Sequence, residues 1–152
     1  MLVKFIKLAY SRLCSDNYYL VWDADTLPVH RIDFFDKIDQ HPYLDLKREY
    51  HPRYFKTLKT LLGIEKAIKD SFIAEHMLIN TNICKEVLSL IEENKALDGN
   101  SFWEKIIFAS SITGESNSFS EFETLGTYFL TKYPHLYKLR KLETLRTGAL
   151  YL

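Results

Sequence analysis

The stretch that decides the fold reads Tyr18-Tyr-Leu-Val-Trp-Asp-Ala-Asp25. Its first five residues favour β structure and lie between a polar turn at 15–17 and Asp23, so we expect a buried strand over 18–22. Pro28 ends any regular structure that begins there. Ligand sites in α/β sheets lie beyond the carboxyl ends of strands. The sequence therefore predicts that Asp23 and Asp25 border a crevice.

The rest of the chain alternates between helical and extended patterns. Apolar spacing predicts helices over 2–14, 53–62, 83–91 and 120–132, and strands over 43–50, 71–80 and 136–142. Gly63 is expected to end the second helix, and Ser101 with Glu104 forms a capping box that starts a further helix. This alternation is typical of one α/β layered domain spanning 1–152.

Composition narrows the class of protein. The 152 residues carry no net charge, so the sequence does not indicate a nucleic-acid partner. Cys14 and Cys84 lack metal-binding spacing and are expected to be buried. No apolar run approaches the roughly 18 residues of a membrane span, and Lys4 and Lys7 interrupt the apolar start. We expect a cytoplasmic protein, with peripheral association at the inner membrane as a further option.

Asp23 and Asp25 are the residues that carry the most specific chemistry. Paired carboxylates suit Mg²⁺ or Mn²⁺ holding a diphosphate, and such an ion neutralises the charge on a departing phosphate. Two alternatives remain open. The triplet also fits a strand-end turn in which Asp caps backbone amides. It fits a haloacid-dehalogenase-type phosphatase less well, because Leu27 stands where that superfamily has Thr or Val.

Four blocks of the sequence resemble a bacterial family described as glycosyltransferase-like and of poorly defined function. They are Tyr19-Leu-Val-Trp-Asp-Ala-Asp-Thr-Leu-Pro28, Phe72-Ile-Ala-Glu-His-Met77, Ser101-Phe-Trp-Glu-Lys105 and Phe119-Ser-Glu-Phe-Glu-Thr-Leu-Gly-Thr-Tyr128. The resemblance implies a GT-A-type fold, with a mixed sheet flanked by helices, and a metal-dependent transfer of sugar from a nucleotide-sugar donor to a glycan or polysaccharide acceptor. It assigns Asp23 and Asp25 to the metal and its diphosphate.

The same resemblance places four further acidic and histidine residues near the crevice: Glu75, His76, Glu121 and Glu123. An inverting transferase needs a carboxylate base, and Glu121 or Glu123 is expected to supply it. Both also match capping boxes, with Ser118 and Ser120 respectively. Glu75 and His76 are neighbours in an expected strand, so their side chains should point to opposite faces.

Two aromatic residues complete the predicted site. Trp22 either packs in the core or contacts a sugar or base, and His51 either contacts substrate or lies in a loop. A GT-A domain normally begins with a strand–helix–strand half that binds the nucleotide. Here one helix precedes the strand over 18–22, so we expect a domain that lacks part of that half. The alternative function is an inactive GT-A-derived binding or interaction module, in which an exposed edge strand favours homo-oligomerisation.

Overall fold

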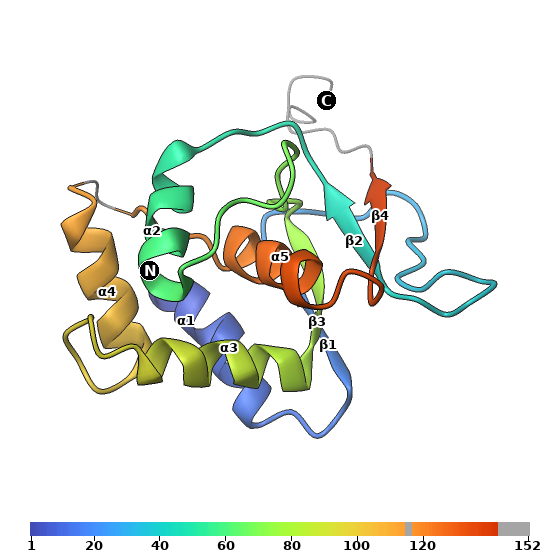
Figure 1. Ribbon diagram of the computed structural model, residues 1–152. Coiled ribbons are helices and arrows are strands. Elements are labelled where there is room, and N and C mark those ends of the chain that lie inside the picture. The colour runs from blue at the N-terminus through green and yellow to red at the C-terminus, as the bar shows by residue number, and fades with distance from the viewer. Residues whose placement is uncertain (115–116, 143–152) are drawn as a thin grey trace.

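The computed structural model describes residues 1–114 and 117–142, which form a mixed α/β structure of small sheets flanked by helices (Figure 1). In chain order the elements are α1 (Leu2–Ala9), η1 (Tyr10–Arg12), β1 (Tyr18–Trp22), β2 (Tyr43–Leu46), α2 (Pro52–Leu62), β3 (His76–Asn80), α3 (Thr81–Glu93), α4 (Phe102–Ile112), α5 (Glu121–Lys132) and β4 (Lys138–Lys141). This class confirms the α/β expectation at the level of architecture.

The four strands found in the described residues form two separate pairs. β1 pairs antiparallel with β3, with Trp22 opposite His76, and β2 pairs parallel with β4, with Asp45 opposite Arg140. A bridge between Lys47 and Ser71 extends β2 on its other side. The residues that follow β1 therefore lie beside the residues that precede β3.

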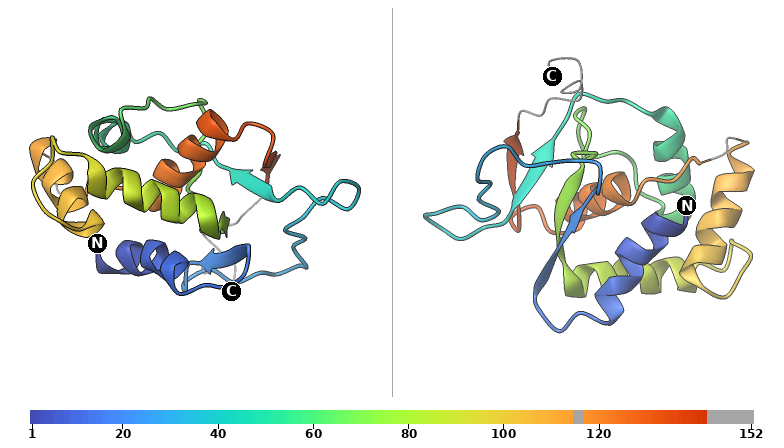
Figure 2. Two further views of the ribbon diagram at one scale, coloured as in Figure 1. Left: turned by 60° about the horizontal axis from the view of Figure 1, so that its bottom comes forward. Right: turned by 180° about the vertical axis from the view of Figure 1, so that it is seen from behind.

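Helix α5 lies in the centre of the molecule and contacts α1, α2 and α3 (Figures 1 and 2). Its first nine residues are all buried, including three that are polar or acidic at its start. Gly126 is required on this helix because a Cβ atom there would meet the ring of Phe72 within 2.3 Å. The first turn of α5 therefore brings carboxylates into the interior, where they need partners.

Most predicted elements are confirmed, and three need correction. The helix expected over 2–14 is α-helical only to Ala9 and then tightens into η1, where the amides of residues 13 and 14 both donate to the Tyr10 carbonyl. The strand expected over 43–50 ends at Leu46. The strand expected over 71–80 begins only at His76, because Glu75 takes a left-handed backbone conformation (φ 62°) that interrupts an extended chain.

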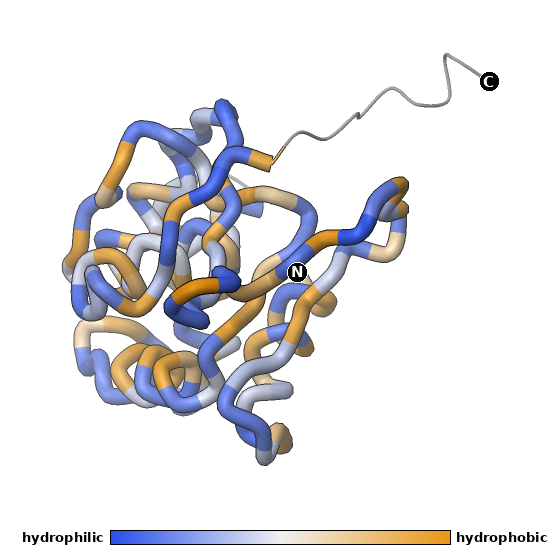
Figure 3. The backbone as a smooth tube through the Cα atoms, turned by 90° about the vertical axis from the view of Figure 1, so that its right-hand side faces the viewer, coloured by the Kyte–Doolittle hydropathy of each residue, from blue (hydrophilic) through white to orange (hydrophobic). Residues whose placement is uncertain are grey.

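Apolar and polar residues alternate along the helices (Figure 3), as their amphipathic patterns predict. The capping box of Ser101 and Glu104 is present, and Gly63 ends α2 in a left-handed conformation. Cys14 and Cys84 are buried free thiols, as expected. Among the described residues, none of the helices is both long enough and apolar enough to cross a membrane.

Candidate functional site

The residues of the Asp-x-Asp triplet follow β1 in a tight turn. The Asp23 amide donates to the Glu75 carbonyl at 2.8 Å, which extends the β1–β3 ladder by one step. The Thr26 amide donates to the Asp23 carbonyl, and the Trp22 indole donates to the Thr26 carbonyl at 2.8 Å. Asp25 is exposed at the tip of this turn. The turn therefore holds its backbone with its own hydrogen bonds and leaves the Asp25 carboxylate facing solvent.

Lys7 connects two of the predicted site residues. Its Nζ lies 2.5 Å from Asp23 Oδ1 and 2.7 Å from Glu121 Oε1, although the two acids lie far apart in the sequence. The same ammonium lies 4.4 Å from the centre of the Phe122 ring. Burial lowers the pKa of Lys7, but its hydrogen bonds to Asp23 and Glu121 outweigh burial and leave that pKa raised. A positive charge is thus fixed between a predicted metal ligand and a predicted base.

Glu123 has a different environment one half-turn along α5. Its Oε1 accepts hydrogen bonds from Ser71 Oγ at 2.6 Å and from the Phe72 amide at 3.0 Å, and its Oε2 lies 2.8 Å from Lys66 Nζ. Ser120 Oγ accepts from the Glu123 amide, so the serine half of the predicted capping box is present. The glutamate half is absent, since both carboxylate oxygens bind the segment before β3.

His76 belongs to a buried charged group that joins the two sheets. Its Nε2 lies 2.8 Å from Asp45 Oδ2, and Arg140 binds both oxygens of Asp45, at 2.6 and 2.8 Å. Burial raises the pKa of Asp45, but Arg140 and His76 outweigh it and leave that pKa lowered. The Trp22 ring stacks on the His76 ring with centroids 4.9 Å apart. His76 is therefore enclosed, and Trp22 is the half-buried member of this stack.

Glu75 and His51 lie on either side of this region. Glu75 keeps its left-handed backbone at the start of β3, and its Oε2 lies 3.7 Å from Lys47 Nζ. A positive φ in a non-glycine residue costs energy and is often found at functional sites. His51 precedes α2, where its Nε2 lies 3.1 Å from Glu49 Oε2. Glu75 therefore lies beside Asp23, because its carbonyl accepts a hydrogen bond from the Asp23 amide. His51 instead pairs with Glu49.

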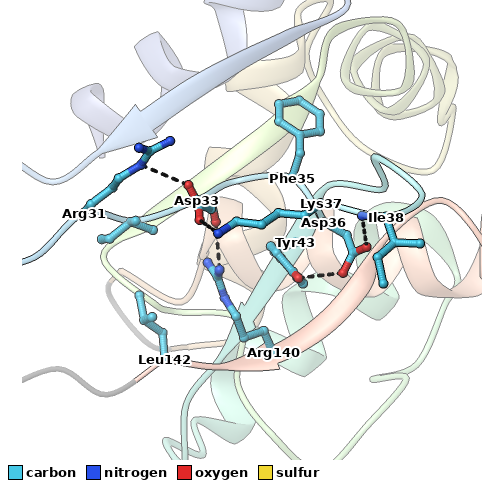
Figure 4. A pocket seen from close by; sticks show the side chains of 10 residues that line it. Arg31, Asp33, Phe35, Asp36, Lys37, Ile38, Tyr43, Arg140 and Leu142 are labelled. Carbon is cyan, nitrogen blue, oxygen red and sulfur yellow. Dashed lines mark hydrogen bonds and ion pairs between the residues drawn. The ribbon is translucent and has the colours of Figure 1, made fainter.

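A separate open pocket of about 370 Å³ lies beside β2 and β4 (Figure 4). Arg31 and Lys37 both bind Asp33 at its rim, and the Tyr43 hydroxyl donates to Asp36 at 2.8 Å. Arg140 lines the pocket and reaches inward to the buried group that contains His76. None of the residues predicted for the site lines this pocket.

The structure adds three residues that the sequence analysis did not assign to the site: Lys7, Asp45 and Arg140. Two of them stand out in the sequence, because Lys7 interrupts an apolar helix and Asp45 lies between two leucines in a strand. Across residues 1–114 and 117–142, no group of three or more His, Cys, Asp and Glu side chains has an arrangement that could hold a metal ion. The metal role of Asp23 and Asp25 stays a prediction.

A family model described as "Family of unknown function (DUF6492)" matches residues 2–147 of this chain. No curated protein matches the chain, and no solved structure matches it.

Proposed function

The chain belongs to the DUF6492 family of unknown function, and we propose that it is a metal-dependent glycosyltransferase of the GT-A type. It would transfer a sugar from a nucleotide-sugar donor to a glycan or polysaccharide acceptor. The observation that carries this proposal is the convergence of Asp23 and Glu121 on the single ammonium of Lys7. Two carboxylates from distant parts of the chain thus already face one cationic group, and Asp25 follows Asp23 by two residues in the same turn.

In the proposed site, Asp25 and the free oxygen of Asp23 bind Mn²⁺ or Mg²⁺, and the ion binds the donor diphosphate. These ions prefer carboxylate oxygens, and the charge they supply stabilises a departing nucleoside diphosphate. Asp25 is suited to this role because it is exposed at the end of a self-supported turn. Lys7 orients Asp23 by donating a hydrogen bond to its Oδ1.

We assign the base of an inverting transfer to Glu121 and a structural role to Glu123. Glu121 shares Lys7 with Asp23, which supports a position close to the proposed metal. Glu123 has both oxygens engaged with residues that precede β3, so its carboxylate positions that segment. Trp22, stacked on His76, would offer an aromatic face to a sugar or base, with Glu75 on the acceptor side.

Calorimetric titration with UDP, with and without Mn²⁺, tests the proposal. We expect Mn²⁺ to tighten the binding of UDP to the wild type, and Asp25→Ala to lose that tightening while keeping its melting temperature. Asp98→Ala is the matched control, because it removes an exposed carboxylate at a distance in the sequence. Binding of UDP that is equally weak or absent in wild type and Asp25→Ala would refute the donor site.

A second function, an interaction module that pairs with a second copy of this chain, is favoured by the outer face of α1. Leu2 and Ile6 on α1 are 71% and 59% exposed, and Leu13, directly after η1, is 82% exposed. In the described part of the chain β1 pairs only with β3, which leaves the other edge of β1 open to a further strand. Light scattering tests this: we expect a concentration-dependent dimer that Ile6→Glu abolishes, and a strictly monomeric wild type would exclude it.

A further inference from the structure

Three cationic side chains converge near the start of α5. Lys7 pairs with Asp23 and Glu121, while Lys4, one turn earlier on α1, donates to the Phe119 carbonyl at 2.5 Å. Arg53, in the first turn of α2, is the third. We define Lys4, Lys7 and Arg53 as the basic cluster.

The Tyr54 ring connects two members of the basic cluster. Lys4 Nζ lies 5.7 Å from the centre of that ring, and the Arg53 guanidinium lies 5.1 Å from it. Seen from behind, α1 and α2 lie next to one another (Figure 2, right). Lys4 also donates to Asn117 Oδ1 at 2.9 Å, at an exposed position. The basic cluster thus extends from the interior at Lys7 to the surface between α1 and α2.

The basic cluster contains more positive charge than its neighbours neutralise. Lys7 forms ion pairs with both nearby carboxylates, those of Asp23 and Glu121. Within 1–114 and 117–142, neither Lys4 nor Arg53 forms an ion pair. The Arg53 Nε–H is buried and has no hydrogen-bond partner there. Burial lowers the pKa of Lys4; Glu121 opposes this effect, whereas Lys7 and Arg53 add to it. The unpaired Arg53 Nε–H and the two cations without a carboxylate partner, Lys4 and Arg53, favour an anionic ligand. Its oxygens would accept the unpaired hydrogen bond and neutralise the positive charge.

We propose that the basic cluster binds the diphosphate group of the donor, with Lys4 and Arg53 contacting phosphate oxygens directly. This inference rests on the proposed function, and it adds a cationic subsite contributed by α1 and α2 to the metal predicted at Asp23 and Asp25. The amino end of α5 adds a favourable dipole next to the same cluster. Diphosphate binding is therefore expected to persist, more weakly, without a divalent metal.

Titration with inorganic pyrophosphate in EDTA tests the basic cluster separately from the metal. We expect the wild type to bind pyrophosphate, and Lys4→Met and Arg53→Met each to weaken binding by about tenfold, the loss of one charged hydrogen bond. Lys95→Met, which removes an exposed lysine elsewhere, is expected to bind like the wild type. Lys4→Arg keeps the charge and is expected to retain binding, so a folding defect in Lys4→Met does not decide the result.

The same variants titrated with UDP and Mn²⁺ separate this inference from the proposed function. Tighter binding of UDP than of pyrophosphate would identify a nucleotide ligand, and equal binding would identify a free diphosphate. Loss of UDP–Mn²⁺ binding in Asp25→Ala, with Lys4→Met and Arg53→Met unaffected, overturns the basic cluster and leaves the metal site standing. Metal-free pyrophosphate binding that requires Lys4 and Arg53, together with UDP–Mn²⁺ binding that Asp25→Ala leaves unchanged, overturns the metal role and leaves the basic cluster standing.

Discussion

Replacing Lys7 with Met is expected to destabilise the fold strongly, because it leaves Glu121 as a buried carboxylate without its cation. The side chains of Lys7, Glu121 and Asp23 are 12%, 4% and 33% exposed. Removing one partner from a buried ion pair costs about 3–5 kcal/mol. The lost contact with Asp23 adds little to this cost, because solvent screens a carboxylate that is one-third exposed. The amino end of α5 returns roughly 0.3–1 kcal/mol to Glu121, so we expect a net loss of about 2–4 kcal/mol.

Urea unfolding at pH 7, followed by tryptophan fluorescence, measures this loss. The full double-mutant cycle uses Lys7→Met, Glu121→Gln and both together. Because Gln removes the charge that Lys7 neutralises, the double variant is expected to lose less than the sum, with a coupling of about 1–3 kcal/mol. Lys95→Met, at an exposed position, serves as the control and should stay within about 0.5 kcal/mol of wild type.

The reasoning about Lys7 would be refuted by either of two results. One is a Lys7→Met protein that unfolds within about 0.5 kcal/mol of wild type at an unchanged m-value. The other is additive losses in the cycle, which would show that the 2.7 Å contact with Glu121 contributes no coupling energy.

Three further predictions follow from contacts in and around the site. Because the folded protein lowers the pKa of Asp45, the ionised carboxylate stabilises the fold at pH values above the unfolded pKa near 3.8, and this stabilisation is lost as the pH falls through the lower folded pKa. The urea midpoint should therefore fall more steeply between pH 6 and pH 2 for the wild type than for Asp45→Asn. Parallel curves for the two proteins would contradict a lowered pKa for Asp45. Gly126→Ala should cost about 1–3 kcal/mol because its methyl group meets Phe72, and thermal melts of Gly126→Ala with and without Phe72→Leu should show partial rescue. Glu75→Gly should be about 1 kcal/mol more stable than Glu75→Ala, because glycine adopts φ 62° without strain; equal stability in chemical denaturation would mean that this backbone stores no strain.

Local patterns in the sequence predicted most of the fold. The strand at Tyr18–Trp22 has the bounds expected from β-favouring residues between a polar turn and Asp23. The start of α4 at the Ser101 capping box and the end of α2 at Gly63 were likewise visible. These features depend on residues within one or two turns of each other, so a single sequence is enough to specify them.

The partners of the site residues could not be predicted, because they come from distant parts of the chain. Spacing matched Glu121 and Glu123 to capping boxes, yet Glu121 pairs with Lys7 across 114 residues and Glu123 binds Ser71 across 52. Likewise, no local pattern links Asp45 with Arg140. Buried charges choose partners by tertiary packing, which periodicity does not encode.

The ion pair between Asp45 and Arg140 can form only late in the synthesis of this protein. The two residues are separated by 95 positions, so at ordinary translation speeds a ribosome needs roughly 5–20 s to travel from one codon to the other. During that interval β2 has no β4 beside it, and the Asp45 carboxylate has no guanidinium. Until β4 pairs with β2, the Asp45 carboxylate of the emerging chain therefore has water as its partner in place of Arg140.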